Sequence, residues 1–202
     1  MIKTNLFILI YLTAISAWAQ EPQPGRVLLT NQTVVEGVVD VNSFINSAIV
    51  TTEDGRQLTY HASMIDKIVT TDECDRMRRY QTFDYRSNSF FDRMEKKIFQ
   101  LVEEGDITLL RRIFEYDVFD AEDEYEVEEW YYVTSRKIRR IKSFRRQLLP
   151  LMADHAQEMR TFKKRNQLGL NRQEAMYLMV SHYNTLKAAD RYRLASADES
   201  GK

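Results

Sequence analysis

Hydrophobic residues between Arg26 and Thr70 recur with a period of two, which is typical of strands with one buried face. Tight turns separate the runs, and Asp54-Gly55 is the dipeptide that most favours a hairpin turn. Residues 62–66 predict one helical turn that places Met64 and Ile65 in the core. The predicted strands are 27–30, 33–41, 48–52, 57–61 and 67–70. This layout is typical of a small SH3-like β-barrel over 26–75, a fold that carries no activity by itself.

The next segment, 76–142, predicts a second antiparallel sheet. Residues 76–86 alternate and indicate a strand that leaves the barrel. Residues 89–104 have two interpretations: Ser89 and Gly105 suit the two ends of a helix, whereas Glu104-Gly105 suits a hairpin turn. We favour a strand at 97–103 paired with 107–116, followed by a hairpin of 129–134 and 137–141.

The last segment, 143–195, has the three- and four-residue spacing of amphipathic helices and predicts a helical pair. The first helix covers 143–166, and Pro150 either kinks it or begins it. Asn171 followed by Glu174 is a helix-start signature, so the second helix begins there. Residues 196–202 are expected to be a disordered tail. The predicted fold class is therefore α+β, with an SH3-like barrel, a second antiparallel sheet and a two-helix pair.

The first nineteen residues have the pattern of a signal peptide. Lys3 supplies the positive end, residues 6–12 an apolar run, and Ala17-Trp18-Ala19 the small residues of a cleavage site. The run is shorter than the roughly 20 apolar residues that span a bilayer. We expect cleavage after Ala19, a linker at 20–25, and a periplasmic or secreted chain without a transmembrane span.

Composition excludes several classes of function. The chain has 29 Lys plus Arg against 30 Asp plus Glu, and a net charge of -1 argues against binding to the nucleic-acid backbone. Its single cysteine, Cys74, excludes metal sites with two or more thiolates. Neighbouring carboxylates disfavour the Cys74 thiolate, so we interpret it as an incidental thiol. No cofactor is predicted.

The near-neutral charge hides two segregated blocks. Residues 115–129 hold nine carboxylates and no base, and residues 136–146 hold seven bases and no acid. The acidic segment is interpreted as a solvated hairpin loop in preference to a calcium loop, because it lacks the register and central glycine of that loop. The basic block either pairs with it or binds an anionic partner. Aromatic residues beside it form either a sugar-stacking surface or core packing. The candidate partner-binding residues are Trp130, Tyr131, Tyr132, Arg136, Lys137, Arg139 and Arg140.

Three stretches carry a resemblance. They are residues 144–155 (FRRQLLPLMADH), Tyr183-Asn184, and residues 104–109 (EGDITL), together with Gly-x-Val and Asp-Gly turns in the N-terminal unit. With these the chain resembles a loose group of uncharacterised exported proteins of Gram-negative bacteria. The resemblance implies the architecture and export. That group has no established activity, so it assigns no catalytic residue.

The sequence contains no recognised catalytic constellation. His-Glu-x-x-His, Gly-x-Ser-x-Gly and Gly-rich phosphate loops do not occur. Of the three histidines, His155 and His182 are either hydrogen-bonded core residues or, with Asp154 or Glu174, a metal half-site; His61 ends a strand. We therefore expect a non-enzymatic cell-envelope protein that binds another protein or an envelope component. The alternative is a hydrolase or metal-dependent enzyme with dispersed active-site residues.

Overall fold

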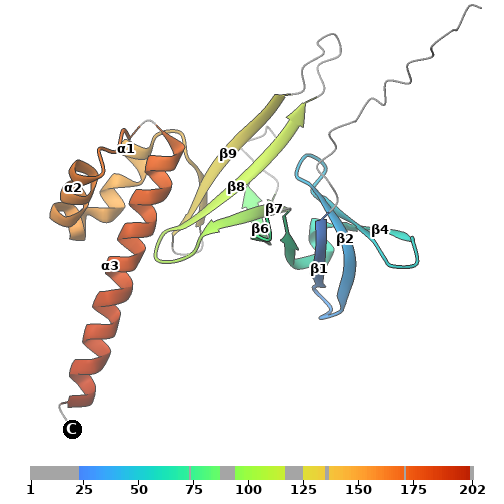
Figure 1. Cartoon of the computed structure of the whole chain (residues 1–202), viewed down its shortest axis with the longest axis horizontal. Coiled ribbons are helices and arrows are strands. Elements are labelled where there is room, and N and C mark those ends of the chain that lie inside the picture. The colour runs from blue at the N-terminus through green and yellow to red at the C-terminus, as the bar shows by residue number, and fades with distance from the viewer. Residues whose placement is uncertain are drawn as a thin grey trace, which may run out of the picture.

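The computed structural model describes residues 23–72, 74–86, 94–116, 125–134, 137–170 and 172–200. Within them the fold is α+β: ten strands form one antiparallel sheet, and three helices follow at the C-terminal end. Figure 1 shows the helices at one end of the molecule and the first strands at the other. The strand order is β10-β9-β8-β7-β6-β5-β1-β2-β3-β4. The strands are β1 Gln23–Leu29, β2 Val34–Asn42, β3 Ser47–Thr51, β4 Gln57–His61, β5 Ile65–Thr71, β6 Met77–Arg86, β7 Met94–Glu103, β8 Thr108–Tyr116, β9 Tyr125–Thr134 and β10 Lys137–Arg140.

The N-terminal strands follow the predicted positions closely, and the 3-10 helix η1 (Ala62–Met64) lies between β4 and β5. Two details differ. Met64 is 46% exposed, whereas Ala62 and Ile65 are buried, because residues three apart share one side of a 3-10 turn. Part of the predicted linker, from Gln23 onward, belongs to β1, where Gly25 pairs with Thr70 of β5.

The predicted division into two sheets is wrong, because β6 pairs with β5 and the strands continue as one sheet. The turn between them is organised by Asp72, which is only 7% exposed. Its Oδ1 accepts hydrogen bonds from the backbone N–H of Cys74 and of Arg76, both at 3.0 Å, and its Oδ2 meets the guanidinium groups of Arg76 and Arg78. This tight turn returns the chain directly onto β5.

In the ambiguous segment, residues 94–103 form β7 and pair with β8, which confirms the strand interpretation. Residues 89–93 lie outside the described residues. The hairpin of β9 and β10 is also confirmed, with Lys137 opposite Thr134 and Arg140 opposite Tyr131.

The segment 143–166, predicted as one helix, forms three helical segments. The C-terminal part is therefore not a simple pair of two helices. The three segments are α1 (Phe144–Gln147), the 3-10 helix η2 (Leu149–His155) and α2 (Ala156–Arg165). Pro150 stands at the start of η2, and Met152 departs from helical geometry (φ -103°, ψ 18°). A proline without a backbone N–H cannot continue an α-helix, so the chain tightens and turns here.

Helix α3 (Gln173–Ser200) extends five residues beyond its predicted end at 195. No glycine or proline interrupts 173–200, and Gly201 follows directly. The predicted N-cap, Asn171, lies outside the described residues. Among the described helices, none is both long and apolar enough to cross a membrane.

Asn184 of α3 attaches the helices to the sheet. Its side chain is 6% exposed; its Oδ1 accepts from the Ile107 N–H at 3.0 Å, and its Nδ2 donates to the Ile107 carbonyl at 2.9 Å. A Cβ at Gly105 would lie 2.4 Å from Asn184 Cγ, so only glycine admits this approach. Two of the stretches that carry the resemblance, 104–109 and Tyr183-Asn184, therefore meet at one structural contact.

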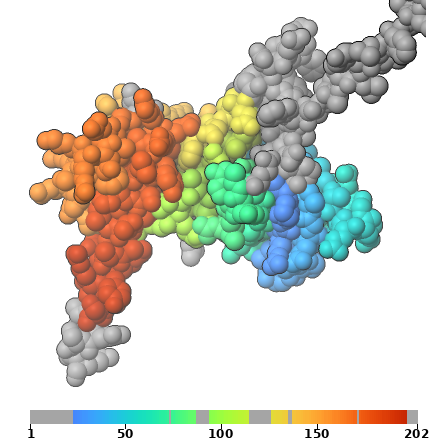
Figure 2. All heavy atoms as spheres, viewed as in Figure 1, coloured from blue at the N-terminus to red at the C-terminus, as the bar shows by residue number. Residues whose placement is uncertain are grey.

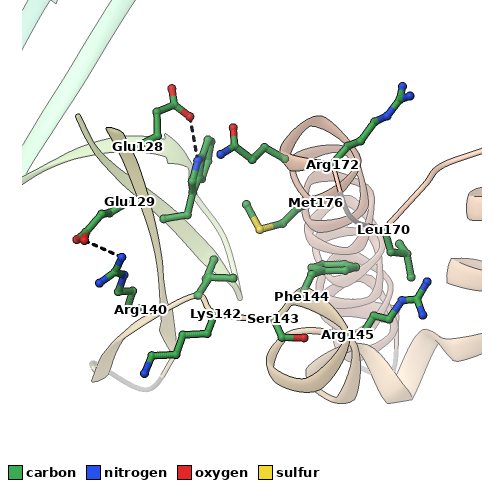
Figure 3. A pocket seen from close by; sticks show the side chains of 13 residues that line it. Glu128, Glu129, Arg140, Lys142, Ser143, Phe144, Arg145, Leu170, Arg172 and Met176 are labelled. Atoms are coloured by element: carbon green, nitrogen blue, oxygen red, sulfur yellow. Dashed lines mark hydrogen bonds and ion pairs between the residues drawn. The ribbon is translucent and has the colours of Figure 1, made fainter. Parts of the chain in front are cut away.

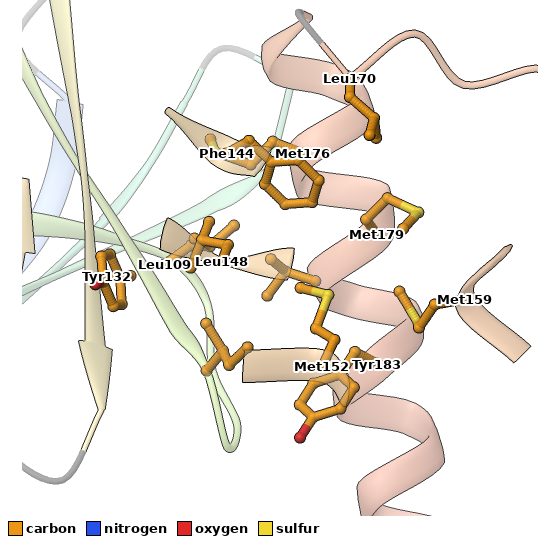
Figure 4. Packing of buried hydrophobic residues seen from close by; sticks show 12 residues of the cluster. Leu109, Tyr132, Phe144, Leu148, Met152, Met159, Leu170, Met176, Met179 and Tyr183 are labelled. Atoms are coloured by element: carbon orange, nitrogen blue, oxygen red, sulfur yellow. The ribbon is translucent and has the colours of Figure 1, made fainter. Parts of the chain in front are cut away.

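The largest buried cluster lies between the sheet and the helices (Figure 4). Leu109 and Tyr132 contribute from the sheet, and Leu148 and Met179 from the helical side. A second cluster fills the N-terminal strands, and Phe99, Leu110 and Tyr131 form a third. In Figure 2 the coloured C-terminal part of α3 projects beyond the body of the molecule.

Candidate functional site

A cleft of about 410 Å³ lies where the β9–β10 end of the sheet meets α1 and α3 (Figure 3). One wall comes from β9 and β10, and the other from α1 and the start of α3. The lining residues are Glu128, Glu129, Trp130, Arg140, Ile141, Lys142, Ser143, Phe144, Arg145, Leu170, Arg172, Gln173 and Met176.

The sheet wall carries two carboxylates whose charges are already compensated. Glu128 accepts hydrogen bonds from Arg111 Nη1 at 2.7 Å and from the indole Nε1 of Trp130 at 3.1 Å. Glu129 pairs with Arg140 Nη2 at 2.8 Å and accepts a hydrogen bond from the Tyr131 hydroxyl. The Arg111 guanidinium also lies 5.7 Å from the centre of the Trp130 ring. This network fixes the indole of Trp130 at the cleft wall.

The floor of the cleft is apolar. Phe144, Leu170 and Met176 are 7%, 9% and 4% exposed and belong to the main core cluster, against which Trp130 and Ile141 pack. Figure 3 shows Met176 reaching from α3 toward the strands and the ring of Phe144 lying against α3. The cleft therefore opens onto the edge of the hydrophobic core.

Gln147 fixes the connection between β10 and α1. Its Oε1 accepts from the backbone N–H of Lys142 at 2.6 Å and of Ser143 at 2.8 Å, and its Nε2 donates to the Arg140 carbonyl at 3.0 Å. One side chain thus satisfies three backbone groups in a segment without regular structure. The cleft wall at this point is preformed.

Three cations remain at the mouth of the cleft: Lys142, Arg145 and Arg172. All three are exposed, and none makes an ion pair with another part of the chain that the structure describes. Figure 3 shows Arg172 at one end of the cleft and Lys142 and Arg145 at the other. We refer to these residues as the three rim cations. Since Glu128 and Glu129 are compensated, the rim carries a net positive charge.

Of the two interpretations of Trp130, Tyr131 and Tyr132, core packing holds for the two tyrosines. Tyr131 and Tyr132 are only 2% and 4% exposed, because successive residues of a strand face opposite sides and both sides are covered here. Tyr131 packs edge-to-face on Phe99 with the ring centres 5.0 Å apart, and burial raises the pKa of its hydroxyl. Only Trp130 lines the cleft.

The predicted basic partner-binding residues lie in different environments. Lys137 and Arg139 are exposed on β10, Arg140 pairs with Glu129, and Arg136 lies outside the described residues. The Arg140–Glu129 pair joins the basic block to the acidic segment, in agreement with the interpretation that the blocks compensate each other locally. Residues 117–124 of the acidic segment lie outside the described residues.

His155 and His182 contact different residues and do not form a shared site. His155 Nε2 lies 2.9 Å from Asp190 Oδ2, and His182 stacks on Phe162 with the ring centres 3.9 Å apart. Burial lowers the pKa of His182. In the described part of the chain, no group of three or more His, Cys, Asp or Glu side chains is placed to hold a metal ion. His61 and Cys74 are exposed.

Sequence reasoning missed Arg172, which lines the cleft, and the buried Arg112, which lies outside the cleft. Arg172 joins the site through tertiary packing alone. Arg112 is 4% exposed, donates to Asn46 Oδ1 at 2.7 Å and to the Ser43 carbonyl, and lies 4.7 Å from the centre of the Phe114 ring. Burial lowers its pKa. It ties the turn after β2 to β8, a contact between residues 66 positions apart that local patterns do not encode.

Comparisons of the chain with protein-family models, curated proteins and solved structures find no match in any of the three.

Proposed function

We propose that the chain is an exported, non-enzymatic protein of the cell envelope that binds another protein or an envelope component in the cleft. One observation carries this: three rim cations without ion pairs among the described residues surround an apolar floor. Ligand sites combine an apolar interior with a few oriented polar groups, in volumes of roughly 300–1,000 Å³. The cleft, at about 410 Å³, falls within that range.

Preorganisation also supports a binding role. Trp130 is fixed by Glu128 and Arg111, and the β10–α1 connection by Gln147. A site that is already ordered loses little conformational entropy when its ligand arrives. The metal-dependent form of the enzymatic alternative has less support, because no group of three or more His, Cys, Asp or Glu side chains in the described part of the chain is placed to hold a metal ion.

We further infer that β1–β5 with η1 form an SH3-like barrel, used here as a scaffold. The strand order β5-β1-β2-β3-β4, with the 3-10 helix between β4 and β5, supports this inference. A close approach supports it too: a Cβ at Gly37 would lie 2.4 Å from the Thr51 carbonyl oxygen, as expected where a strand bends sharply against its neighbour.

Export is tested by the intact mass of the chain recovered from the periplasm or medium. We expect a mature protein that begins at Gln20, and the resemblance to exported proteins of Gram-negative bacteria supports the same outcome. A chain that keeps Lys3 and stays in the cytoplasm would contradict export.

Binding in the cleft is tested by photo-crosslinking in the native envelope. A photoreactive amino acid replaces Gln173, an exposed residue of the cleft, or Gln57, an exposed residue on β4 at the other edge of the sheet. We expect a discrete adduct from position 173 and none from position 57. Equal adducts from both positions, or none from position 173, would contradict the proposal.

A further inference from the structure

We propose that the cleft takes an extended acidic peptide segment that carries one apolar side chain. This deepens the binding role proposed above and depends on it.

The floor suits one bulky apolar side chain. Trp130, Phe144 and Met176 offer an indole face, a phenyl ring and a thioether around the same space. Aromatic rings contribute large contact areas with few rotatable bonds, and methionine adapts to the shape of what it contacts. An aliphatic or aromatic side chain from a ligand would extend the core cluster outward.

The charges select an acidic partner. The three rim cations stand at both ends of the cleft, and the two carboxylates of the sheet wall are already bonded to Arg111 and Arg140. A ligand with carboxylates on either side of its apolar residue would place one negative charge near each end. A basic ligand would meet like charges at both ends.

The neighbouring strand favours a peptide over a lipid or a polysaccharide. β10 stands at the end of the strand order, so no other described strand pairs with its outer side. Gln147 Nε2 already binds the Arg140 carbonyl there, which leaves the residues of β10 before Arg140 for a peptide to pair with. It leads directly into Ile141 and Lys142 of the cleft. A peptide in extended conformation can hydrogen-bond to such an edge while its side chains enter the adjacent space. Acyl chains and sugars lack the alternating N–H and C=O groups that this edge requires.

The test is fluorescence anisotropy with the purified chain and fluorescein-labelled Asp-Glu-Phe-Asp-Glu-Leu. The control peptide is Lys-Lys-Phe-Lys-Lys-Leu. We compare the wild type with the triple variant Lys142→Gln/Arg145→Gln/Arg172→Gln. The matched variant is Arg160→Gln/Lys164→Gln/Arg165→Gln, which removes the same charge from exposed positions of α2 outside the cleft.

We expect the acidic peptide to bind the wild type and the α2 variant alike and the cleft variant about tenfold more weakly, since rim ion pairs contribute modestly one by one. Binding should weaken as salt is raised. Equal loss in both variants would overturn the inference in favour of bulk charge attraction. No peptide binding, with cleft-dependent binding to vesicles of anionic phospholipid instead, would overturn the peptide class. A crosslink at position 173 would in either case leave the binding role standing.

Discussion

The two ends of the sheet are filled in different ways. In the N-terminal strands the buried residues are short and mostly β-branched: Val27, Val39, Ala48, Val50, Ile65 and Ile68. At the helical end the buried residues are long and flexible or aromatic: Phe144, Met152, Met159, Met176, Met179 and Tyr183. A small pocket of about 10 Å³ lies beside Val39 and Tyr80 among the described N-terminal residues, whereas the cleft of about 410 Å³ lies at the helical end.

This difference follows from the geometry of the elements. Strands that pair along their length bring β-branched side chains into regular contact, which fills space evenly. At the helical end, strands β9 and β10 pack against short and irregular helical segments, where flexible methionines such as Met176 fill irregular space. We therefore expect the N-terminal strands to provide rigidity and the junction with the helices to provide the binding surface.

The largest expected loss of stability comes from removing the Asn184 contact that attaches the helices to the sheet. Asn184→Ala leaves the buried N–H and C=O of Ile107 without partners and should lower the free energy of unfolding by about 3 kcal/mol. The measurement is urea unfolding followed by circular dichroism. Asn166→Ala is the control, because Asn166 is exposed and its side chain bonds locally, to the Phe162 carbonyl at the end of α2; it should cost less than about 0.5 kcal/mol. Similar losses in both variants would show that Asn184 does not join the two parts.

The next prediction concerns how the two cores respond to a change of shape. Val50→Leu adds a methylene where Gly37 already approaches closely, and should cost about 2 kcal/mol through overpacking. Met179→Leu conserves volume in the methionine-rich cluster and should cost only about 0.5 kcal/mol. Thermal unfolding of both variants measures the two losses of stability. If Val50→Leu is the milder change, the contrast between the cores is wrong.

A smaller effect concerns acid stability at the turn between β5 and β6. Burial raises the pKa of Asp72, but hydrogen bonds from Arg76 and from the Cys74 N–H lower it more, to about 2. An unfolded aspartate titrates near 3.9. The contribution of Asp72 is thus complete above about pH 4 and is lost as the pH falls toward 2. Asp72→Asn should flatten the pH dependence of the unfolding free energy in that window, and an unchanged profile would contradict the assignment.

The smallest expected effect lies at the rim. The variant Lys142→Gln/Arg145→Gln/Arg172→Gln should unfold within about 0.5 kcal/mol of the wild type, because these exposed side chains make no ion pairs with other described residues. Chemical unfolding provides the measurement. A loss of several kcal/mol would mean that the rim cations hold the fold together, and would remove the reason to assign them to a ligand.

Local patterns predicted most strands because period two and tight turns are local properties. The hairpin at Asp54-Gly55 and the turn at Glu104-Gly105 are both found. The pairing of β5 with β6 depends on how Asp72 binds two arginines. The interruption at Pro150 is predicted from the sequence, but the 3-10 geometry that follows it through His155 depends on tertiary packing. Neither is a periodic signal. For this reason the sequence predicts two separate sheets where the structure has one, and two α-helices where the structure has three.

The site was predicted less well for the same reason. The sequence placed Trp130 and the basic block near each other, and both contribute to the cleft. It left open whether Tyr131 and Tyr132 are core residues, and it could not show that Arg172, the residue before α3, lines the cleft. Burial on both faces of a strand and contacts across the helix–sheet junction are set by tertiary packing.

Trp130 offers the most direct test of the central claim, that the cleft is where this chain binds. The chain has two tryptophans, and the other, Trp18, lies in the segment expected to be removed. Titrating the chain that begins at Gln20 with unlabelled Asp-Glu-Phe-Asp-Glu-Leu should produce a saturable change in Trp130 fluorescence, which the Lys142→Gln/Arg145→Gln/Arg172→Gln variant should show about tenfold more weakly. Peptide binding that leaves Trp130 fluorescence unchanged would place the site elsewhere and contradict the account.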